Sequence, residues 1–234
     1  MTIEGVKISE LFHSIQGEGK LTGVPSVFVR ASGCNLRCTW CDTPYASWEP
    51  EGENQSIDAI VDQVAKFSAR HVVLTGGEPM IMPDIAALCD ALKQRNYYLT
   101  IETAGTVFQP VQIDLASISP KLANSTPTER EGGRFAAAHE KNRLNISVIQ
   151  QLIDAAPDFQ LKFVVANQSD MSEIETVLKQ LRGWQPADVL LMPEGIDAQM
   201  QAERSGWVSE ICKQRGFRFC PRLHIALYGN QRGT

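Results

Sequence analysis

Three cysteines stand close together, at Cys34, Cys38 and Cys41, with the spacing C-x3-C-x2-C. Thiolates so near one another in sequence can hold one metal centre. A structural zinc ion takes four protein ligands, whereas a [4Fe–4S] cluster held by only three thiolates keeps one iron open for a small molecule. The spacing therefore favours an iron–sulfur cluster. A zinc site completed by Asp42 or by a distant cysteine or histidine remains an alternative.

The other three cysteines, Cys89, Cys212 and Cys220, are scattered through apolar stretches. Free cysteine behaves as a small buried hydrophobe, so we expect these three in the core. We expect the chain to be cytosolic, where thiols stay reduced, and therefore expect no disulfide.

A second segment, Thr75-Gly76-Gly77-Glu78-Pro79, follows an apolar run, and Gly76 lies 35 residues after Cys41. Glycine lets a backbone approach a ligand closely, because it has no Cβ. The cysteines and this GGEP element, in this order, resemble the radical S-adenosylmethionine (SAM) superfamily. The resemblance implies that the three cysteines hold a [4Fe–4S] cluster whose open iron binds the amino and carboxylate groups of SAM. Reductive cleavage of SAM would give methionine and a 5′-deoxyadenosyl radical, which removes a hydrogen atom from the substrate.

Further segments narrow the resemblance: FHSIQGEG at 12–19, CDT at 41–43, IETAG at 101–105, SPK at 119–121 and PRLHIALYG at 221–229. Their order resembles the 7-carboxy-7-deazaguanine synthases, a radical SAM family of 7-deazapurine (queuosine precursor) biosynthesis. The implied enzyme is a carbon–nitrogen lyase that converts 6-carboxy-5,6,7,8-tetrahydropterin to 7-carboxy-7-deazaguanine with loss of ammonia. The resemblance also implies that SAM is regenerated, that Mg2+ takes part, that an external donor supplies electrons, and that the protein is a homodimer.

The family's substrate-binding positions match Ile15, Gln16, Gly17, Arg30, Thr75 and His224. An amide such as Gln16 donates and accepts hydrogen bonds, which suits the edge of a pterin. The planar guanidinium of Arg30 suits a carboxylate held by two hydrogen bonds. Glu18 and His224 are candidates for handling protons. Residues 230–234 extend beyond the compact family members, which puts in doubt a role for a terminal carboxylate at the site.

The family's SAM-binding positions match Trp40, Cys41, Asp42, Gly77, Ser119, Pro120, Lys121 and, more loosely, Met192, Pro193 and Glu194. Thr43 matches a Mg2+ ligand, and its hydroxyl is the hard oxygen donor that Mg2+ prefers. One hydroxyl cannot hold the ion alone, so we expect weak Mg2+ binding until the substrate carboxylate joins.

The elements that must position these residues alternate between apolar runs and helical periods. Strands are expected at 7–12, 27–30, 71–74, 97–101, 115–118, 161–165, 189–192 and 218–219, and helices at 57–67, 84–95, 146–155, 172–181 and 198–215. Such alternation predicts a mainly parallel sheet with right-handed crossovers. Because a full eightfold barrel needs about 250 residues, we expect an α/β fold that is a partial TIM-like barrel. A polar insertion at 122–145 is either a flap over the site or a surface excursion.

The 234 residues carry 22 Lys+Arg and 27 Asp+Glu, a net charge of −5. This acidity argues against nucleic acid as a partner. The sequence has no apolar run long enough to span a membrane and no signal peptide at its start. We therefore expect one cytoplasmic domain over 1–234 that binds a small-molecule pterin and neither nucleic acid nor membrane. Two other functions stay open, a glycyl-radical-enzyme activase and a non-catalytic zinc-binding module.

Overall fold

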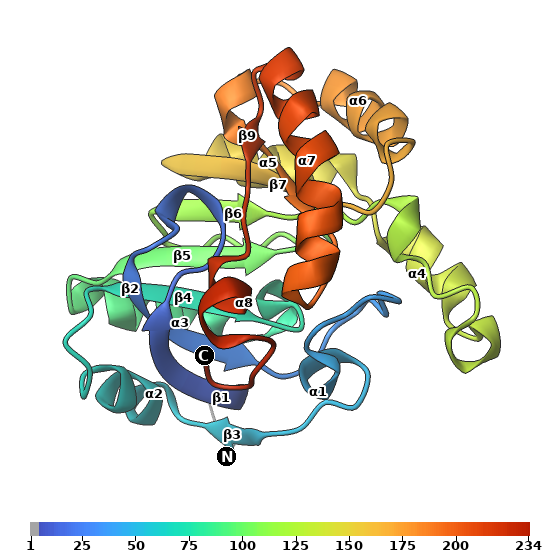
Figure 1. The fold of residues 1–234 in the computed structure, drawn as a ribbon. Coiled ribbons are helices and arrows are strands. Elements are labelled where there is room, and N and C mark those ends of the chain that lie inside the picture. Colours follow the sequence, from blue (N-terminus) through green and yellow to red (C-terminus); the bar gives the residue numbers. More distant parts are fainter. Residues whose placement is uncertain (1–4) are drawn as a thin grey trace.

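The computed structural model describes residues 5–234, and its centre is one open, nine-stranded sheet (Figure 1). The strand order is β3-β1-β2-β4-β5-β6-β7-β8-β9. The strands are β1 Val6–Ile15, β2 Pro25–Ala31, β3 Glu53–Gln55, β4 His71–Gly76, β5 Tyr98–Thr103, β6 Leu115–Ile118, β7 Asp158–Val165, β8 Val189–Pro193 and β9 Arg218–Phe219. From β2 to β9 every neighbouring pair is parallel. The expected partial α/β barrel is confirmed.

The first strand departs from the expected alternation, because β1 runs antiparallel to both β2 and β3. Only a single 3-10 turn, Gly19–Leu21, and no α-helix, lies between β1 and β2. The connecting segment 16–24 instead crosses to the far strands, where the Lys20 N–H donates to Gln160 Oε1 on β7 at 2.7 Å. This segment carries the expected substrate residues across the open side of the sheet.

The helices are α1 Pro44–Ser47, α2 Ile57–Val64, α3 Ile85–Gln94, α4 Ala136–Asn142, α5 Ile146–Ala155, α6 Asp170–Gln180, α7 Ala198–Arg215 and α8 Leu223–Tyr228. The helices α2, α3, α5, α6 and α7 lie outside the curved sheet, whereas α8 follows β9 and lies over the open side of the sheet (Figure 1). Side-chain caps begin three of them: Ser56, Asn145 and Asp197 each accept a backbone N–H from three residues ahead. Gly216, in the left-handed conformation, ends α7.

The core fills the space between the sheet and these helices. Val72, Leu74, Leu99 and Ile101 on the central strands are fully buried against the apolar faces of α2 and α3, as expected for parallel strands covered by helices. Cys89 and Cys212 are buried in the same core. No helix within residues 5–234 has both the length and the hydropathy needed to cross a membrane.

The polar insertion at 122–145 contains α4 and packs against the cysteine loop. The backbone N–H of Thr39 donates to the Ser125 carbonyl at 2.8 Å, and the Trp40 indole donates to the Asn124 carbonyl at 3.0 Å. The N–H of Arg37 donates to Nδ1 of His139 at 3.1 Å. The insertion therefore covers the cysteine loop from outside.

Candidate active site

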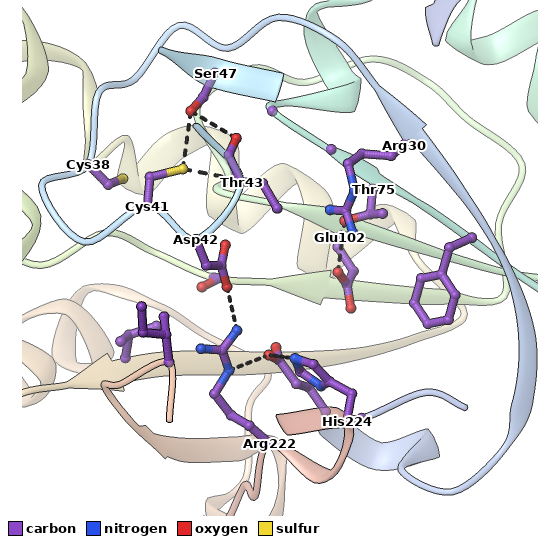
Figure 2. Close-up of a pocket in the computed structure, with 18 of the residues that line it drawn as sticks. Arg30, Cys38, Cys41, Asp42, Thr43, Ser47, Thr75, Glu102, Arg222 and His224 are labelled. Atoms are coloured by element: carbon purple, nitrogen blue, oxygen red, sulfur yellow. Dashed lines mark hydrogen bonds and ion pairs between the residues drawn. The ribbon is translucent and has the colours of Figure 1, made fainter. Parts of the chain in front are cut away.

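A cavity of about 560 Å³ opens at the carboxyl ends of the parallel strands (Figure 2), where parallel α/β folds place their sites. It is lined by the β1–β2 segment, the cysteine loop, the ends of β4 to β8 and the chain after β9. The expected site residues that line it are Ile15, Gln16, Gly17, Glu18, Arg30, Cys34, Cys38, Trp40, Cys41, Asp42, Thr43, Thr75, Gly77, Ser119, Lys121, Met192 and His224.

Three expected residues do not line the cavity, namely Pro120, Pro193 and Glu194. The Glu194 carboxylate points to Arg204 of α7 instead, at 3.3 Å. The Pro193 carbonyl accepts a hydrogen bond from Gln201 at 2.9 Å. These two residues anchor the end of β8 to α7, while Met192 alone of this trio lines the cavity.

Cys34, Cys38 and Cys41 lie on one loop after β2 and all line the cavity as free thiols. The loop is held by the Trp48 indole, which donates to the Cys38 carbonyl at 3.0 Å. Within residues 5–234, no three Cys, His, Asp or Glu side chains gather tightly enough to share a single metal ion. Three thiols on one loop that all line one cavity fit a [4Fe–4S] cluster, which cysteine thiolates hold.

Burial raises the pKa of Cys34 and of Cys38 to about 12. Both sulfurs therefore carry protons until a metal binds, because metal ligation requires the thiolate and releases the proton. Cluster assembly at this loop should accordingly release protons.

The GGEP element joins β4 to the cysteine loop. A Cβ at Gly76, which has φ +133°, would lie 2.1 Å from the Ala31 carbonyl oxygen, and one at Gly77 would lie 2.1 Å from the Gly33 carbonyl oxygen. Both glycines are therefore required by protein packing as well as by any ligand. The fully buried Glu78 accepts from the Thr103 hydroxyl at 2.7 Å and from the Ala104 N–H at 2.8 Å. It ties the end of β4 to the end of β5.

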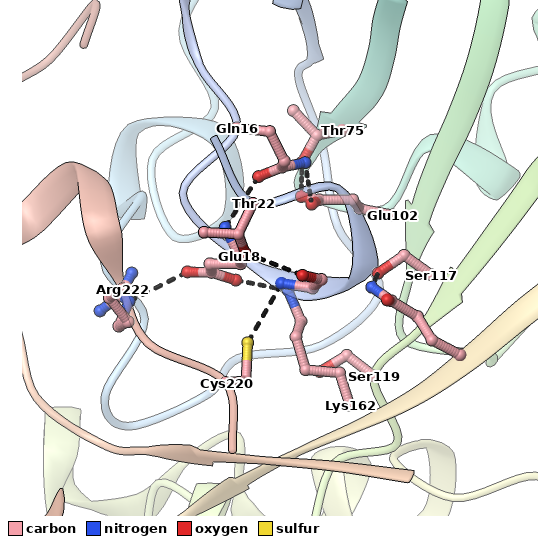
Figure 3. A network of polar contacts seen from close by, with 12 residues as sticks. Gln16, Glu18, Thr22, Thr75, Glu102, Ser117, Ser119, Lys162, Cys220 and Arg222 are labelled. Atoms are coloured by element: carbon pink, nitrogen blue, oxygen red, sulfur yellow. Dashed lines mark hydrogen bonds and ion pairs between the residues drawn. The ribbon is translucent and has the colours of Figure 1, made fainter. Parts of the chain in front are cut away.

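A chain of buried charges crosses the floor of the cavity (Figures 2 and 3). The Glu18 carboxylate receives Lys162 Nζ of β7 and, at 3.0 Å, Arg222 Nε. Arg222 also donates to the Asp42 carboxylate and, at 2.8 Å, to the Gly195 carbonyl. His224 Nε2 lies 4.0 Å from Glu18. Arg222 thereby links Glu18, a candidate for handling protons, to Asp42, an expected SAM residue.

The charges in this chain set one another's ionisation. Burial alone would raise the pKa of Glu18, but Lys162 and Arg222 hold it well below its usual range. Asp42 is similar, since burial opposes its ionisation and Arg222 more than compensates, so that its pKa is lowered. Burial lowers the pKa of His224, despite the opposing charge of Glu18. At neutral pH Glu18 and Asp42 are therefore ionised, and the His224 imidazole is neutral.

Glu102 forms a second polar group on the cavity wall, at the end of β5 (Figure 3). It accepts from the Thr75 hydroxyl at 2.9 Å and from the Gln16 amide at 3.3 Å. The Gln16 oxygen in turn accepts the Glu18 N–H at 3.1 Å. Two expected substrate residues thus have their donors oriented by one carboxylate, as a hydrogen-bonding pocket for a heterocycle requires.

Ser119 and Lys121 follow β6, the strand next to β5. Lys121 Nζ donates to the Ser119 hydroxyl at 2.8 Å and lies 5.9 Å from the centre of the Trp40 ring. Their neighbour Ser117 also lines the cavity. A cationic and a hydroxyl group are therefore placed beside the cysteine loop.

Sequence reasoning missed three charged residues of the site: Glu102, Lys162 and Arg222. The sequence did contain a signal for Lys162, because this lysine interrupts the apolar strand LKFVV. A buried lysine almost always has a partner of opposite charge. Glu102 and Arg222 lie within segments that carry the family resemblance. Only the fold shows that they meet Gln16, Glu18 and Asp42.

Comparisons with known proteins agree with this geometry. A family model described as the radical SAM superfamily matches residues 28–119. A 7-carboxy-7-deazaguanine synthase from Rhodopirellula baltica is 48% identical over 227 residues, covering 97% of this chain and 88% of the relative. One from Halobacterium salinarum is 47% identical, covering 95% and 90%. The crystal structure of QueE from Escherichia coli superposes with a TM-score of 0.70 at 26% identity, covering 94% of this chain and 95% of that one. The chain therefore belongs to the 7-carboxy-7-deazaguanine synthase family of radical SAM enzymes.

Proposed function

We propose that the chain converts 6-carboxy-5,6,7,8-tetrahydropterin to 7-carboxy-7-deazaguanine with loss of ammonia. The observation that carries this proposal is the single cavity that joins the three cysteines to Arg30 and to the Gln16–Glu102 pair. The carboxylate of such a ligand would meet the guanidinium of Arg30. Its heterocyclic ring would meet the amide of Gln16 and the carboxylate of Glu102. The relatives share the synthase name, and this leaves an activase or a zinc module without support.

Cys34, Cys38 and Cys41 would hold the [4Fe–4S] cluster. The cluster and SAM, when bound, would supply the radical chemistry that removes a hydrogen atom from the substrate. The side chains and backbone of the protein bind SAM and the substrate and orient them. We propose that Trp40, Asp42, Gly77, Ser119, Lys121 and Met192 contact SAM, and that the backbone around Pro120, Pro193 and Glu194 supports that surface from behind.

At the substrate end, we propose that Ile15, Gln16, Gly17, Arg30, Thr75 and His224 bind the pterin. Glu18 is held ionised by Lys162 and Arg222, so it acts as a hydrogen-bond acceptor and does not donate a proton. His224 is neutral, so its imidazole can both accept and donate. Of the two candidates for proton handling, His224 is therefore favoured.

Thr43 is the proposed Mg2+ ligand, and it lines the cavity beside Cys41, with its hydroxyl 3.8 Å from the sulfur. The nearest carboxylate in sequence, Asp42, is engaged by Arg222. The missing oxygens must then come from substrate and water. Calorimetric titration of Mg2+ should show tight binding only when the pterin is present; equal tight binding without it would contradict this proposal.

The reaction is tested by anaerobic incubation of the reduced, cluster-loaded enzyme with SAM, Mg2+ and the carboxypterin, followed by mass spectrometry. We expect 7-carboxy-7-deazaguanine and ammonia. Replacing Cys34, Cys38 or Cys41 by Ala should abolish product and cluster, whereas Cys89→Ala, on the buried face of α3, should keep both. An intact cluster that forms no deazaguanine acid would refute the substrate assignment.

We further propose that residues 1–234 act as one cytoplasmic domain, that an external protein or chemical donor reduces the cluster, and that the enzyme is a homodimer. Sedimentation equilibrium of the cluster-loaded enzyme tests the dimer, and a monomer at micromolar concentration would contradict it.

A further inference from the structure

Glu10, on the strand β1, is a carboxylate that does not itself line the cavity. Its Oε1 accepts from Arg30 Nε at 2.5 Å and from the Tyr45 hydroxyl at 2.8 Å. Its Oε2 lies 3.4 Å from Arg232 Nε. The side chain is only 11% exposed, so these three donors surround it almost completely.

We propose that Glu10 is a positioning residue that orients Arg30 for a substrate carboxylate, and that Arg232 and Tyr45 hold Glu10 in place. We call Glu10, Tyr45 and Arg232 the Glu10 latch. The proposal rests on the proposed function, in which Arg30 binds the carboxylate of the pterin.

The orientation of Arg30 follows from the atom that Glu10 engages. Because Glu10 takes the Nε hydrogen, the two Nη nitrogens stay available for a ligand, and Figure 2 shows the guanidinium turned into the cavity. Arg30 also lies over the Phe12 ring, 5.6 Å from its centre. A guanidinium fixed on one edge and one face can hold a carboxylate with two parallel hydrogen bonds.

Arg232 comes from the segment that follows α8, and residues 230–234 line the cavity next to β1 (Figure 1). Its guanidinium stacks on the Tyr45 ring, 4.1 Å from the centre, and pairs with Glu51 at 2.9 Å. Arg232 is 46% exposed, and so exposed an ion pair contributes little to stability by itself. Arg232 lines the cavity itself and also reaches Arg30 through Glu10, which both guanidinium groups contact.

The latch also explains why one carboxylate beside Arg30 does not block substrate. Glu10 is shared among Arg30, Arg232 and Tyr45, so its charge is not available to Arg30 alone. Arg30 stays cationic toward the cavity, since the negative groups around it raise its pKa more than burial lowers it.

The test measures binding and turnover of the cluster-loaded enzyme with SAM. Glu10→Gln keeps the shape of the side chain and removes its charge. We expect the dissociation constant and KM for the carboxypterin to rise about tenfold, the loss of one charge-assisted hydrogen bond, while kcat changes less than about twofold. Binding of a tetrahydropterin that lacks the 6-carboxylate should not change.

Arg232→Ala should act in the same direction as Glu10→Gln, and Arg232→Lys should restore part of the affinity. Glu51→Gln is the matched control, because it removes the other partner of Arg232 and leaves Glu10 untouched. Unchanged carboxypterin affinity in Glu10→Gln would overturn the proposal, as would an equal loss for both pterins. If the wild type does not bind the carboxypterin at all, the proposed function fails, which is a different result from a wild type and variant that bind it equally.

Discussion

Lys162 and Glu18 form a buried ion pair between positions 144 residues apart in the chain. Lys162 projects from β7, and Glu18 reaches it from the segment that joins β1 to β2 (Figure 3). Their side chains are only 7% and 13% exposed. Because the sheet is open, this pair and Arg222 join its two sides across the cavity floor. The Lys162–Glu18 pair therefore holds the β1–β2 segment in place as one wall of the site.

We expect Lys162→Met to destabilise the protein by about 3–5 kcal/mol, the cost of leaving one partner of a buried pair without the other. The pKa of Glu18 should rise, because only Arg222 then opposes the effect of burial. Urea unfolding at pH 7 measures the stability. The loss should shrink as pH falls below 4.5, the ordinary pKa of a glutamate side chain, because protonation of Glu18 removes the charge that Lys162 no longer balances.

Lys213→Met is the control, since Lys213 pairs with Glu210 on the surface of α7 and is 71% exposed. Exposed pairs of this kind contribute about 0–1 kcal/mol. If both substitutions lower the free energy of unfolding equally, the Lys162–Glu18 pair stabilises the protein no more than an exposed pair does.

The sheet was predictable because most of its strands are apolar runs in the sequence. The elements at 115–118, 146–155, 198–215 and 218–219 have the expected bounds, since buried parallel strands and capped helices leave local signals. The helix at 172–181 begins two residues earlier than expected, at Asp170, within the usual uncertainty of helix ends. The cysteine loop and GGEP were found because their chemistry is local in sequence.

The rest of the site required the fold. The antiparallel direction of β1 was not predictable, because strand–helix alternation says nothing of a strand with no helix after it. Glu10 sits in an alternating strand and reads as a solvated charge, yet it is surrounded by Arg30, Tyr45 and Arg232. Arg232 lies in a polar stretch with no periodicity. Contacts of this kind join distant segments, and no local pattern encodes them.

Gly17→Ala should weaken substrate binding by displacing His224. A Cβ at Gly17 would lie 2.0 Å from His224 Nδ1 and 2.9 Å from its backbone nitrogen, and α8 is tied to this point by the Leu223 N–H, which donates to the Gly17 carbonyl at 2.9 Å. Overpacking of this kind costs about 1–3 kcal/mol. We expect the melting temperature to fall and KM for the pterin to rise.

Gly206→Ala is the matched control, because Gly206 lies within α7 and a Cβ there meets nothing within 4 Å. It should be neutral or stabilise by up to about 1 kcal/mol, since alanine favours the helix. A Gly17→Ala enzyme with unchanged KM would show that His224 tolerates displacement.

His71 should make stability depend on pH in a defined window. It is buried between Ser26 and Thr100, whose hydroxyls lie 2.7 and 2.8 Å from its ring nitrogens, and burial lowers its pKa from 6.5 to about 4. Between these values the unfolded chain takes up a proton that the native protein refuses, so this contribution to stability is present above pH 6.5 and is lost as pH falls towards 4.

His71→Gln keeps hydrogen-bonding groups and removes this titration. The variant should be less stable than the wild type at pH 7, and the gap should narrow by about 1.4 kcal/mol per pH unit below 6.5. His13→Gln, at an exposed position of β1, is the control for exchanging a histidine for a glutamine outside the core. Urea unfolding at half-unit pH steps checks both, and a constant gap for His71→Gln would contradict the assignment.

His139 should matter for how firmly the cysteine loop keeps its cluster. The Arg37 N–H donates to its Nδ1, so the imidazole is neutral with its proton on Nε2, which faces the Ser125 hydroxyl at 2.9 Å. Through Ser125 the insertion also holds the Thr39 N–H. His139→Ala leaves a buried N–H without its acceptor, at a cost of about 1–3 kcal/mol, next to Cys38. We expect faster bleaching of the iron–sulfur absorbance when a chelator is added, and a lower iron content after anaerobic reconstitution.

Lys141→Ala, exposed on the same helix α4, is the control and should bleach at the wild-type rate. If both variants keep the cluster equally well, the insertion is a passive cover and the cysteine loop holds its shape unaided.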